Sequence, residues 1–335
     1  MVKYNPVMDN LKIGFIGYGR HARANIYPSI RHLGYKISAI ATTHEDSALQ
    51  GSQDYSVPKY YTSHLEMLKN EKLDIVFICA KPEQQVQLVK DSLNTGVNVF
   101  VEKNLGFSET EAEEIKVLSE KVGKKVVIGF MKRFAPIYLK LQEIVKDEKF
   151  GKVISLSQIF TSRNFVSNSK EYLLFATIHF VDLIRFYVGE IKEVKGFQTV
   201  DGDTLSLTFS LLSESGATIS LYYSASPSWS SGVQEITITG SNGYARTNGI
   251  SNLKYHYNES KSETPGWQTV EEKEVQLNTM LTTGGGGIQN LYLNGFIGEI
   301  DYFLKSINKK LKPVNDTSEN VKTMKLYDML VKCLF

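Results

Sequence analysis

The chain has 335 residues, which is long enough for two domains that each bury their own hydrophobic core. Its 38 lysines and arginines nearly balance its 36 aspartates and glutamates. The resulting formal net charge of +2, without a block of like charges, argues against a nucleic-acid or membrane surface. No apolar run approaches the roughly 20 residues that span a bilayer, and residues 1–10 lack the apolar core of a signal peptide, so we expect a cytoplasmic protein.

The first predicted element is a short buried strand over residues 12–16 that runs into a glycine turn. Gly17-x-Gly19-x-x-Ala22 has the spacing of a dinucleotide-binding turn, in which Gly17 permits the tight turn, Gly19 leaves room for a pyrophosphate and Ala22 allows close helix–strand packing. A helix is predicted over residues 20–32, kinked or split by Pro28, with its N–H groups directed at the phosphates. Glycine turns are common, but this position between a strand and a helix favours a nucleotide site.

The second predicted strand covers residues 37–41. About 20 residues past the glycines, an NAD-binding fold usually carries a carboxylate that bonds the ribose hydroxyls. This chain has hydroxyl and imidazole groups there, which favours NADP, because a carboxylate would repel a 2′-phosphate. The residues that favour NADP are Arg20, Thr42, Thr43 and His44. The alternative is that Glu45 or Asp46, beyond the strand end, reaches back to the ribose.

Strands and helices alternate through the rest of the first half. Capping boxes begin helices at Ser63 and Ser108, and Pro82 suits the first turn of another helix. Strands are predicted at residues 74–80, 98–101 and 125–129. The alternation predicts a doubly wound parallel sheet, and ligands bind such sheets beyond the carboxyl ends of the strands. Lys103 follows one strand end, although position alone does not distinguish it from a solvated surface lysine.

The pattern changes from about residue 131. Helices are predicted over residues 135–149 and 171–188, with a strand at 153–160 and a loop containing Arg163 and Asn164 between them. Alternating apolar runs at 205–211, 217–223 and 234–240 predict a mostly antiparallel sheet. A run of four glycines at 284–287 precedes two predicted helices, 293–308 and 319–332. We therefore predict an N-terminal domain over residues 1–130 and a second, α+β domain over residues 131–335.

The helix predicted around His179 carries a second candidate site. Phe175, His179, Asp182 and Phe186 share one face by i, i+3, i+4 spacing. Histidine is the side chain best suited to moving a proton near neutral pH, and oxidation of an alcohol by hydride loss needs a base. The alternative is a structural histidine that pairs with Asp182. The two cysteines do not form a disulfide pattern, and the six histidines lack metal-ligand spacing, so we predict no metal site.

Taken together, four segments resemble the glucose–fructose oxidoreductase and inositol dehydrogenase family (Gfo/Idh/MocA). They are Gly17-Tyr-Gly19-Arg-His-Ala22, residues 96–105 with Glu102-Lys103-Asn104, residues 129–136 with Arg133-Phe134-Ala-Pro136, and His179-Phe-Val-Asp182-Leu183. The resemblance covers nearly the whole chain. It implies an N-terminal Rossmann domain and a C-terminal domain with an open, mostly antiparallel sheet. The exposed face of that sheet commonly makes a dimer or tetramer in the family.

The resemblance also implies roles for single residues. Lys103 matches the family's catalytic lysine, and His179 matches its catalytic histidine. Two positions depart from the family: Asn104 replaces the usual proline after the lysine, and Phe175 replaces an aspartate one helical turn before the histidine. The expected cofactor-binding residues are Gly17, Gly19, Arg20, His21, Ala22, Thr42, Thr43, His44, Ala80, Lys81, Pro82, Glu102 and Lys103. The expected substrate-binding residues are Lys103, Arg163, Asn164, Phe175, His179 and Asp182.

These observations predict an NAD(P)-dependent oxidoreductase, with NADP slightly favoured. It would transfer hydride between the nicotinamide and a carbon of a sugar, cyclitol or sugar derivative. Two alternatives remain open. Phe175 suits an NADPH-dependent reductase of a less polar carbonyl or imine. The third possibility is a non-catalytic, nucleotide-binding sensor, against which the presence of Lys103 and His179 argues.

Overall fold

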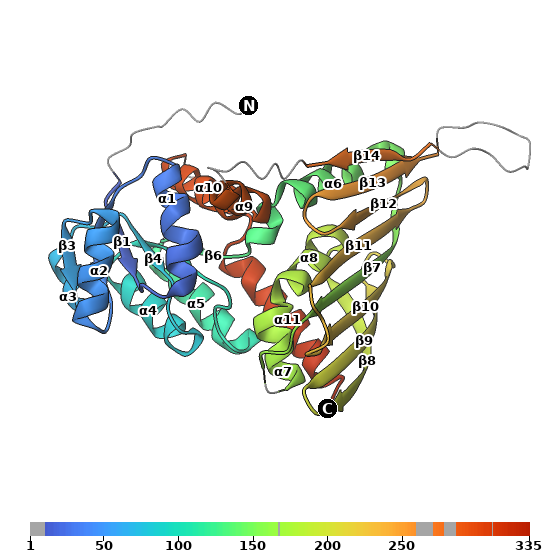
Figure 1. Ribbon diagram of the computed structural model, residues 1–335, viewed down its shortest axis with the longest axis horizontal. Helices are drawn as coiled ribbons and strands as arrows, with labels where there is room; N and C mark the ends of the chain where they lie inside the picture. The colour runs from blue at the N-terminus through green and yellow to red at the C-terminus, as the bar shows by residue number, and fades with distance from the viewer. Residues whose placement is uncertain (1–10, 167, 259–270, 278–285, 310) are drawn as a thin grey trace, which may run out of the picture. The chain divides into compact units, whose positions relative to one another are not determined.

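The computed structural model describes residues 11–166, 168–258, 271–277, 286–309 and 311–335 (Figure 1). By its internal contacts the chain forms two compact units. The first contains the residues up to Met131 together with Asn290–Lys325, and the second contains Lys132–Gln289 and Leu326–Phe335. The first unit therefore includes a late segment that the sequence assigns to the second domain. Residues 1–10, and 284–285 of the four-glycine run, lie outside the described residues.

The first unit is built on a six-stranded sheet in which every neighbouring pair is parallel. Its order is β3-β2-β1-β4-β5-β6, which is the strand order of a Rossmann fold. The predicted fold class of this half is therefore confirmed. The strands are β1 (Ile13–Ile16), β2 (Ile37–Ala41), β3 (Lys59–Tyr61), β4 (Ile75–Ile78), β5 (Asn98–Val101) and β6 (Val126–Ile128).

Helices follow most of these strands, and the serine caps form as predicted. The Ser63 and Ser108 hydroxyls accept hydrogen bonds from the N–H groups of Glu66 and Glu111. Pro28 lies in the first turn of α1, where the helical segment changes from π to α geometry. The helices are η1 (Ala22–Ile26), α1 (Tyr27–His32), α2 (Glu45–Tyr55), α3 (His64–Asn70), α4 (Pro82–Asn94), α5 (Glu109–Val122), α9 (Gly286–Asn294) and α10 (Phe296–Asn308).

An aromatic core joins one face of the parallel sheet to α1 and α10. Phe15 stacks on Tyr27 with 3.9 Å between ring centroids, and Phe77 packs edge-on against Phe303 at 5.8 Å. All four rings are fully buried. Because α10 belongs to the late segment 290–325, this end of the chain completes the core beneath the glycine turn.

The second unit contains an eight-stranded sheet of order β14-β13-β12-β11-β7-β10-β9-β8. β7 and β10 run parallel, and the other described neighbours are antiparallel, as predicted. The sequence did not predict β8, β12, β13 or β14. The strands are β7 (Val153–Ser162), β8 (Ile191–Asp201), β9 (Thr204–Ser213), β10 (Thr218–Ala225), β11 (Val233–Gly240), β12 (Gly243–Asn248), β13 (Asn252–Tyr257) and β14 (Lys273–Gln276).

Helices α6 and α8 lie on one face of this sheet (Figure 1). Side chains on that face, such as Phe209, Tyr223 and Ile238, are buried, whereas Thr208, Ser220 and their neighbours alternate onto the other face. The remaining helices are η2 (Met131–Phe134), α6 (Pro136–Lys146), η3 (Glu148–Phe150), α7 (Ser169–Glu171), η4 (Tyr172–Ala176), α8 (Ile178–Val188) and α11 (Thr317–Lys332).

The helix predicted over residues 171–188 is not continuous. A π-helical turn, η4, ends at Ala176, and α8 begins at Ile178 after Thr177. Two hydrogen bonds lie near this break: the Tyr172 hydroxyl donates to the Ser224 carbonyl on β10, and the fully buried Thr177 hydroxyl donates to the Leu173 carbonyl four residues earlier. Phe175 therefore lies in η4 and His179 in α8, and the single helix predicted over residues 171–188 is wrong.

Among the helices that the structure describes, none combines the length and the apolar character needed to cross a bilayer.

Candidate functional site

The glycine turn between β1 and η1 has the two properties predicted for it. Gly17 has φ of 105°, a conformation that favours glycine, and an added Cβ there would lie 2.1 Å from the Cys79 carbonyl oxygen. At Gly19, in contrast, an added Cβ would meet nothing within 4 Å. Gly17 thus allows β1 and β4 to approach closely, and Gly19 opens the turn to space in which a pyrophosphate fits.

The space beside Gly19 is a cavity of about 800 Å³ within the first unit. It contains most of the predicted cofactor-binding residues: Gly17, Gly19, Arg20, His21, Thr42, Thr43, His44, Ala80 and Lys81. Ala22 is fully buried, Pro82 begins α4, and Glu102 and Lys103 follow β5; these four do not line the cavity. The sequence did not point to several other polar lining residues, among them Ser47, Thr62, His64, Gln84 and Gln87. Two of them, Gln84 and Gln87, are three residues apart on α4 and so share a face. This spacing can be seen in the sequence and would have predicted that they line the same surface.

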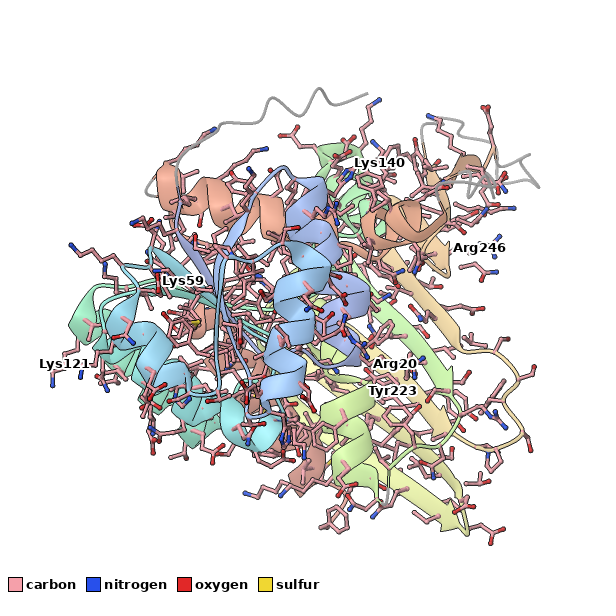
Figure 2. All side chains as sticks on the ribbon, turned by 60° about the vertical axis from the view of Figure 1, so that its left-hand side comes forward. Arg20, Lys59, Lys121, Lys140, Tyr223 and Arg246 are labelled. Carbon is pink, nitrogen blue, oxygen red and sulfur yellow. The ribbon has the colours of Figure 1, made fainter. Side chains whose placement is uncertain are left out.

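The end of the cavity nearest β2 carries hydroxyl, imidazole and guanidinium groups. Glu45 and Asp46 are exposed in the first turn of α2 and do not line the cavity. Arg20 is also exposed (Figure 2), and among the described residues no hydrogen bond or ion pair holds its guanidinium. Thr42 donates its hydroxyl to the His44 carbonyl over 2.7 Å, which shapes the loop into α2. One carboxylate, Glu83 on α4, does line the cavity.

Lys103 follows β5, next to β4 and therefore close to the glycine-turn edge of the sheet. The carboxylate of the preceding Glu102 is buried; its Oε2 accepts the Lys103 N–H over 3.2 Å, and its Oε1 lies 3.2 Å from His21 Nε2. The Lys103–Asn104 peptide bond is cis, and the Asn104 side chain donates to the Gly106 carbonyl. Burial lowers the pKa of the Lys103 ammonium, and the Glu102 charge opposes this in part.

The candidate histidine of the second unit is buried in the first turns of α8. Asp182, three residues further on, binds Arg133 through two hydrogen bonds: Nε donates to Oδ2 over 2.6 Å and Nη2 donates to Oδ1 over 2.7 Å. The guanidinium also lies over the Phe186 ring, 5.3 Å from its centroid. The Asp182 carboxylate is thus turned to Arg133 in the interior, and its expected role in substrate binding stays a prediction.

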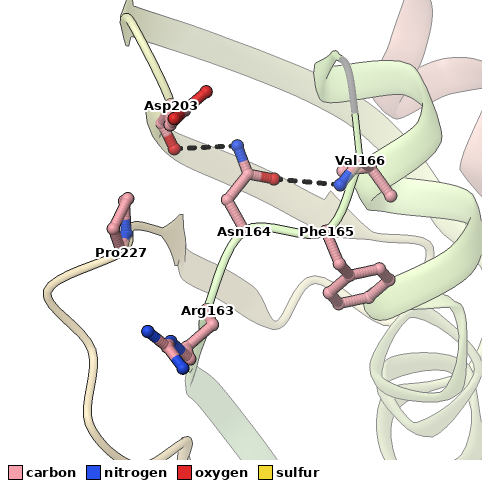
Figure 3. A pocket seen from close by; sticks show the side chains of 6 residues that line it. All are labelled: Arg163, Asn164, Phe165, Val166, Asp203 and Pro227. Atoms are coloured by element: carbon pink, nitrogen blue, oxygen red, sulfur yellow. Dashed lines mark hydrogen bonds between the residues drawn. The ribbon is translucent and has the colours of Figure 1, made fainter.

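A second cavity, of about 510 Å³, lies at the loop after β7 and is lined by Arg163, Asn164, Phe165, Val166, Asp203 and Pro227 (Figure 3). Asn164 is occupied in shaping this loop, because its amide donates to the Asp203 carbonyl over 2.8 Å and accepts the Val166 N–H over 3.1 Å. Arg163 is exposed, and the described residues provide no ion pair for it. Of the two predicted substrate ligands in this loop, Arg163 is thus the one with uncommitted donors.

Comparison with known proteins agrees with this geometry. Residues 11–130 match the family model GFO_IDH_MocA, described as an oxidoreductase family with an NAD-binding Rossmann fold. This part of the chain is similar to the Gfo/Idh/MocA oxidoreductases. The first two of the four sequence motifs lie inside the matched residues, and the matched family is described as NAD-binding.

Similar proteins include both curated relatives and solved structures. Oxidoreductase P35 of Formosa agariphila is 25% identical over 198 residues, which cover 54% of this chain and 62% of that protein. The scyllo-inositol 2-dehydrogenase (NAD(+)) of Bacillus subtilis is 29% identical over 195 residues, or 56% and 55% of the two chains. The matched part of this chain thus spans less than two thirds of each curated relative. A dehydrogenase crystal structure from Chromobacterium violaceum shares the fold, with a TM-score of 0.85, 20% identity and coverage of 97% and 95%.

Proposed function

We propose that this protein is an NAD(P)-dependent oxidoreductase that transfers hydride between the nicotinamide and a carbon of a sugar, cyclitol or sugar derivative. The observation that carries the proposal is the glycine turn that opens into a cavity at the carboxyl edge of a parallel sheet, with Lys103 at the end of β5 on the same edge. When bound, the nicotinamide supplies the hydride donor or acceptor. The inositol dehydrogenase among the relatives supports the substrate class.

Two side chains are assigned to the chemistry. The Lys103 ammonium holds the reacting oxygen and stabilises the negative charge that develops on it, and partial burial strengthens that interaction. His179 accepts the proton when an alcohol is oxidised and donates it in the reverse direction. The cofactor phosphates bind at the turn formed by Gly17, Gly19 and Arg20, with the N–H groups of the following helix.

We further propose a preference for NADP. The Arg20 guanidinium is uncommitted and can pair with a ribose 2′-phosphate, and the Thr43 and Ser47 hydroxyls line the same cavity. Glu45 and Asp46 stay outside the cavity wall, so they would not repel the phosphate at contact distance. Catalytic efficiency measured with both cofactors tests this: a higher kcat/KM with NADH would overturn the preference.

Substrate contacts come from the second unit. Arg163 offers a planar pair of donors suited to a carboxylate or to vicinal hydroxyls, and Phe175 adds a half-buried apolar ring. Asn164 supports the loop. The apolar Phe175 favours a second candidate function, NADPH-dependent reduction of a carbonyl or imine in a less polar substrate. Turnover in the reducing direction alone, at every pH tested, would select this second function.

We also propose a cytoplasmic homo-oligomer that pairs through the outer face of the eight-stranded sheet. That face carries short side chains such as Ser157, Ser220 and Thr237 on neighbouring inner strands, and Phe197, which is 79% exposed, on the edge strand β8. A surface of short side chains with the exposed aromatic rings of Tyr222 and Phe197 suits a face-to-face contact. Light scattering after size-exclusion chromatography measures the mass, and Phe197→Glu is expected to shift it toward the monomer. A wild-type protein that is monomeric at all concentrations would contradict the pairing.

The deciding experiment joins cofactor binding to turnover. Purified protein is titrated with NADPH and NADH by cofactor fluorescence, then screened on a panel of sugars, cyclitols and carbonyl compounds in both directions. Lys103→Met and His179→Asn are expected to keep cofactor binding while each lowers kcat by about 10²- to 10³-fold. Matched controls are Lys121→Met, an exposed lysine on α5 (Figure 2), and His256→Asn on β13. Binding of both cofactors without turnover would favour a sensor, and binding of neither would overturn the proposal.

A further inference from the structure

His21 occupies an unusual place in the dinucleotide turn, because its side chain reaches from the phosphate-binding segment to the end of β5. It follows Gly19 and Arg20 and lines the same cavity. Its Nε2 lies 3.2 Å from Glu102 Oε1, although the two residues are far apart in the sequence. This His21–Glu102 contact, called the tie below, joins the segment proposed to hold the phosphates to the segment that carries Lys103.

The Glu102 carboxylate, at the other end of this contact, has little free space around it. The Glu102 side chain is 7% exposed, and its Oε2 accepts the Lys103 backbone N–H over 3.2 Å. An added Cβ at Gly129, on the neighbouring strand end, would lie 3.0 Å from the same oxygen, so the space holds the carboxylate and little else. His21 is therefore placed to fix Glu102, and through it the backbone from which the Lys103 side chain departs.

The surroundings of His21 accommodate both of its charge states. Its Nδ1 lies 3.0 Å from the Asn25 side-chain nitrogen, and its ring packs edge-on against Phe296 on α10 at 5.6 Å. The Asn25 amide can offer its NH2 to a neutral ring or, after turning over, its oxygen to a protonated ring. The charged groups that face the ring are Glu102 and Lys103 at the end of β5, and α10 contributes only the uncharged Phe296.

We propose that His21 is a positioning residue for the dinucleotide site: it ties the phosphate-binding turn to the Glu102–Lys103 end of β5, and dinucleotide binding is accompanied by proton uptake at His21. This inference rests on the proposed dinucleotide binding and goes beyond it. A bound pyrophosphate adds negative charge at the turn, and an imidazolium in the same cavity interacts favourably with it, whereas a neutral ring does not.

The direction of the pH effect follows from the same contacts. Burial lowers the pKa of His21, but the Glu102 charge and hydrogen bond outweigh this, so the pKa is raised above its ordinary value of 6.5. Proton uptake on binding requires that the dinucleotide raise this pKa further. If it does so by one unit, the Kd rises by up to about tenfold as the pH passes from below to above the two pKa values.

Binding measured against pH tests the proton uptake. NADH is the probe, because the 2′-phosphate of NADPH titrates near pH 6 and would add its own pH dependence. The Kd is measured by cofactor fluorescence from pH 5.5 to 9 for the wild type, His21→Asn, His21→Lys and the control His256→Asn. We expect the wild type and the control to weaken by about threefold to tenfold with rising pH. His21→Asn should have a smaller slope, and His21→Lys should restore tight binding across the range. His44 and His64 also line the cavity, so the result is the difference in slope between the variants.

A second measurement tests the tie without any cofactor. The pKa of His21 is read by NMR in the unliganded protein, assigned by loss of its signal in His21→Asn. Glu102→Gln is expected to lower that pKa, and His21→Asn to speed hydrogen exchange at the Lys103 amide. An unchanged pKa and unchanged exchange would overturn the positioning role, and equal Kd slopes in wild type and His21→Asn would overturn the proton uptake. Absence of NADH and NADPH binding at every pH would instead contradict the proposed function, and with it the proton uptake.

Discussion

The chain buries two carboxylates next to its two proposed catalytic side chains, and it balances them in different ways. Glu102 in the first unit faces His21, whose side chain is 45% exposed and changes charge near neutral pH. Asp182 in the second unit binds Arg133 through two short hydrogen bonds, and the two side chains are 1% and 4% exposed. The first carboxylate has a titratable partner at the surface, and the second has a permanently charged partner in the interior.

The two ion pairs therefore differ in role: His21–Glu102 responds to pH and ligand charge, and Arg133–Asp182 stabilises the fold. A guanidinium keeps its proton at every physiological pH, so the Arg133–Asp182 pair holds α8 against η2 under all conditions. An imidazole beside a carboxylate responds to pH and to nearby phosphate charge. We therefore expect variants of the first pair to change ligand binding, and variants of the second to change stability.

The largest expected effect comes from breaking the interior pair. Arg133→Met removes the cation and leaves the Asp182 carboxylate buried, which we expect to lower the free energy of unfolding by about 3–5 kcal/mol. The measurement is urea denaturation followed by circular dichroism. Lys140→Met, at a half-exposed position of α6 where Lys140 pairs with Glu143, serves as the control and should change stability by less than about 0.5 kcal/mol. A loss of less than about 1 kcal/mol in Arg133→Met would show that the pair does not support the unit.

An intermediate effect on stability is expected at the glycine turn, where Gly17 and Gly19 have different roles. Gly17→Ala forces an alanine into a backbone conformation that only glycine adopts readily and against the Cys79 carbonyl, so a loss of at least about 1–3 kcal/mol of stability is expected. Gly19→Ala places its methyl group in open space and should leave stability within about 0.5 kcal/mol, while weakening NADPH binding at least about tenfold. Denaturation and cofactor titration of both variants check this. Equal loss of stability in the two variants would contradict the division of roles.

The features predicted correctly from the sequence are those that depend on residues close together in the chain. The turn at Gly17 and Gly19, the Ser63 and Ser108 caps and the strand over residues 37–41 each depend on a few adjacent side chains, and all are present in the structure. The family motifs extended this to single residues, and identified Lys103 in the first unit and His179 in the second as candidates.

The features that the sequence did not predict depend on contacts between distant segments. Near the break at Thr177, Tyr172 bonds to β10, and a helical spacing pattern does not contain that contact. The pairs His21–Glu102 and Arg133–Asp182 join residues 81 and 49 positions apart. For the same reason the contact between Asp182 and Arg133 could not be predicted from the spacing of Asp182 and His179, because Arg133 lies on another helix.

The smallest expected effect on stability comes from breaking the His21–Glu102 pair. His21→Asn should lower the free energy of unfolding by no more than about 1 kcal/mol, because water screens a half-exposed ion pair. Since the pKa of His21 is raised in the folded protein, the protonated pair stabilises the fold fully below pH 6.5, and this contribution is lost as the pH rises through the folded-state pKa. Wild type and His21→Asn should therefore differ most in stability at pH 6 and converge by pH 9 in urea denaturation. A stability difference between wild type and His21→Asn that grew with pH would mean that a group other than His21 balances the Glu102 charge. The proposed contrast between the two buried carboxylates would then be wrong for Glu102.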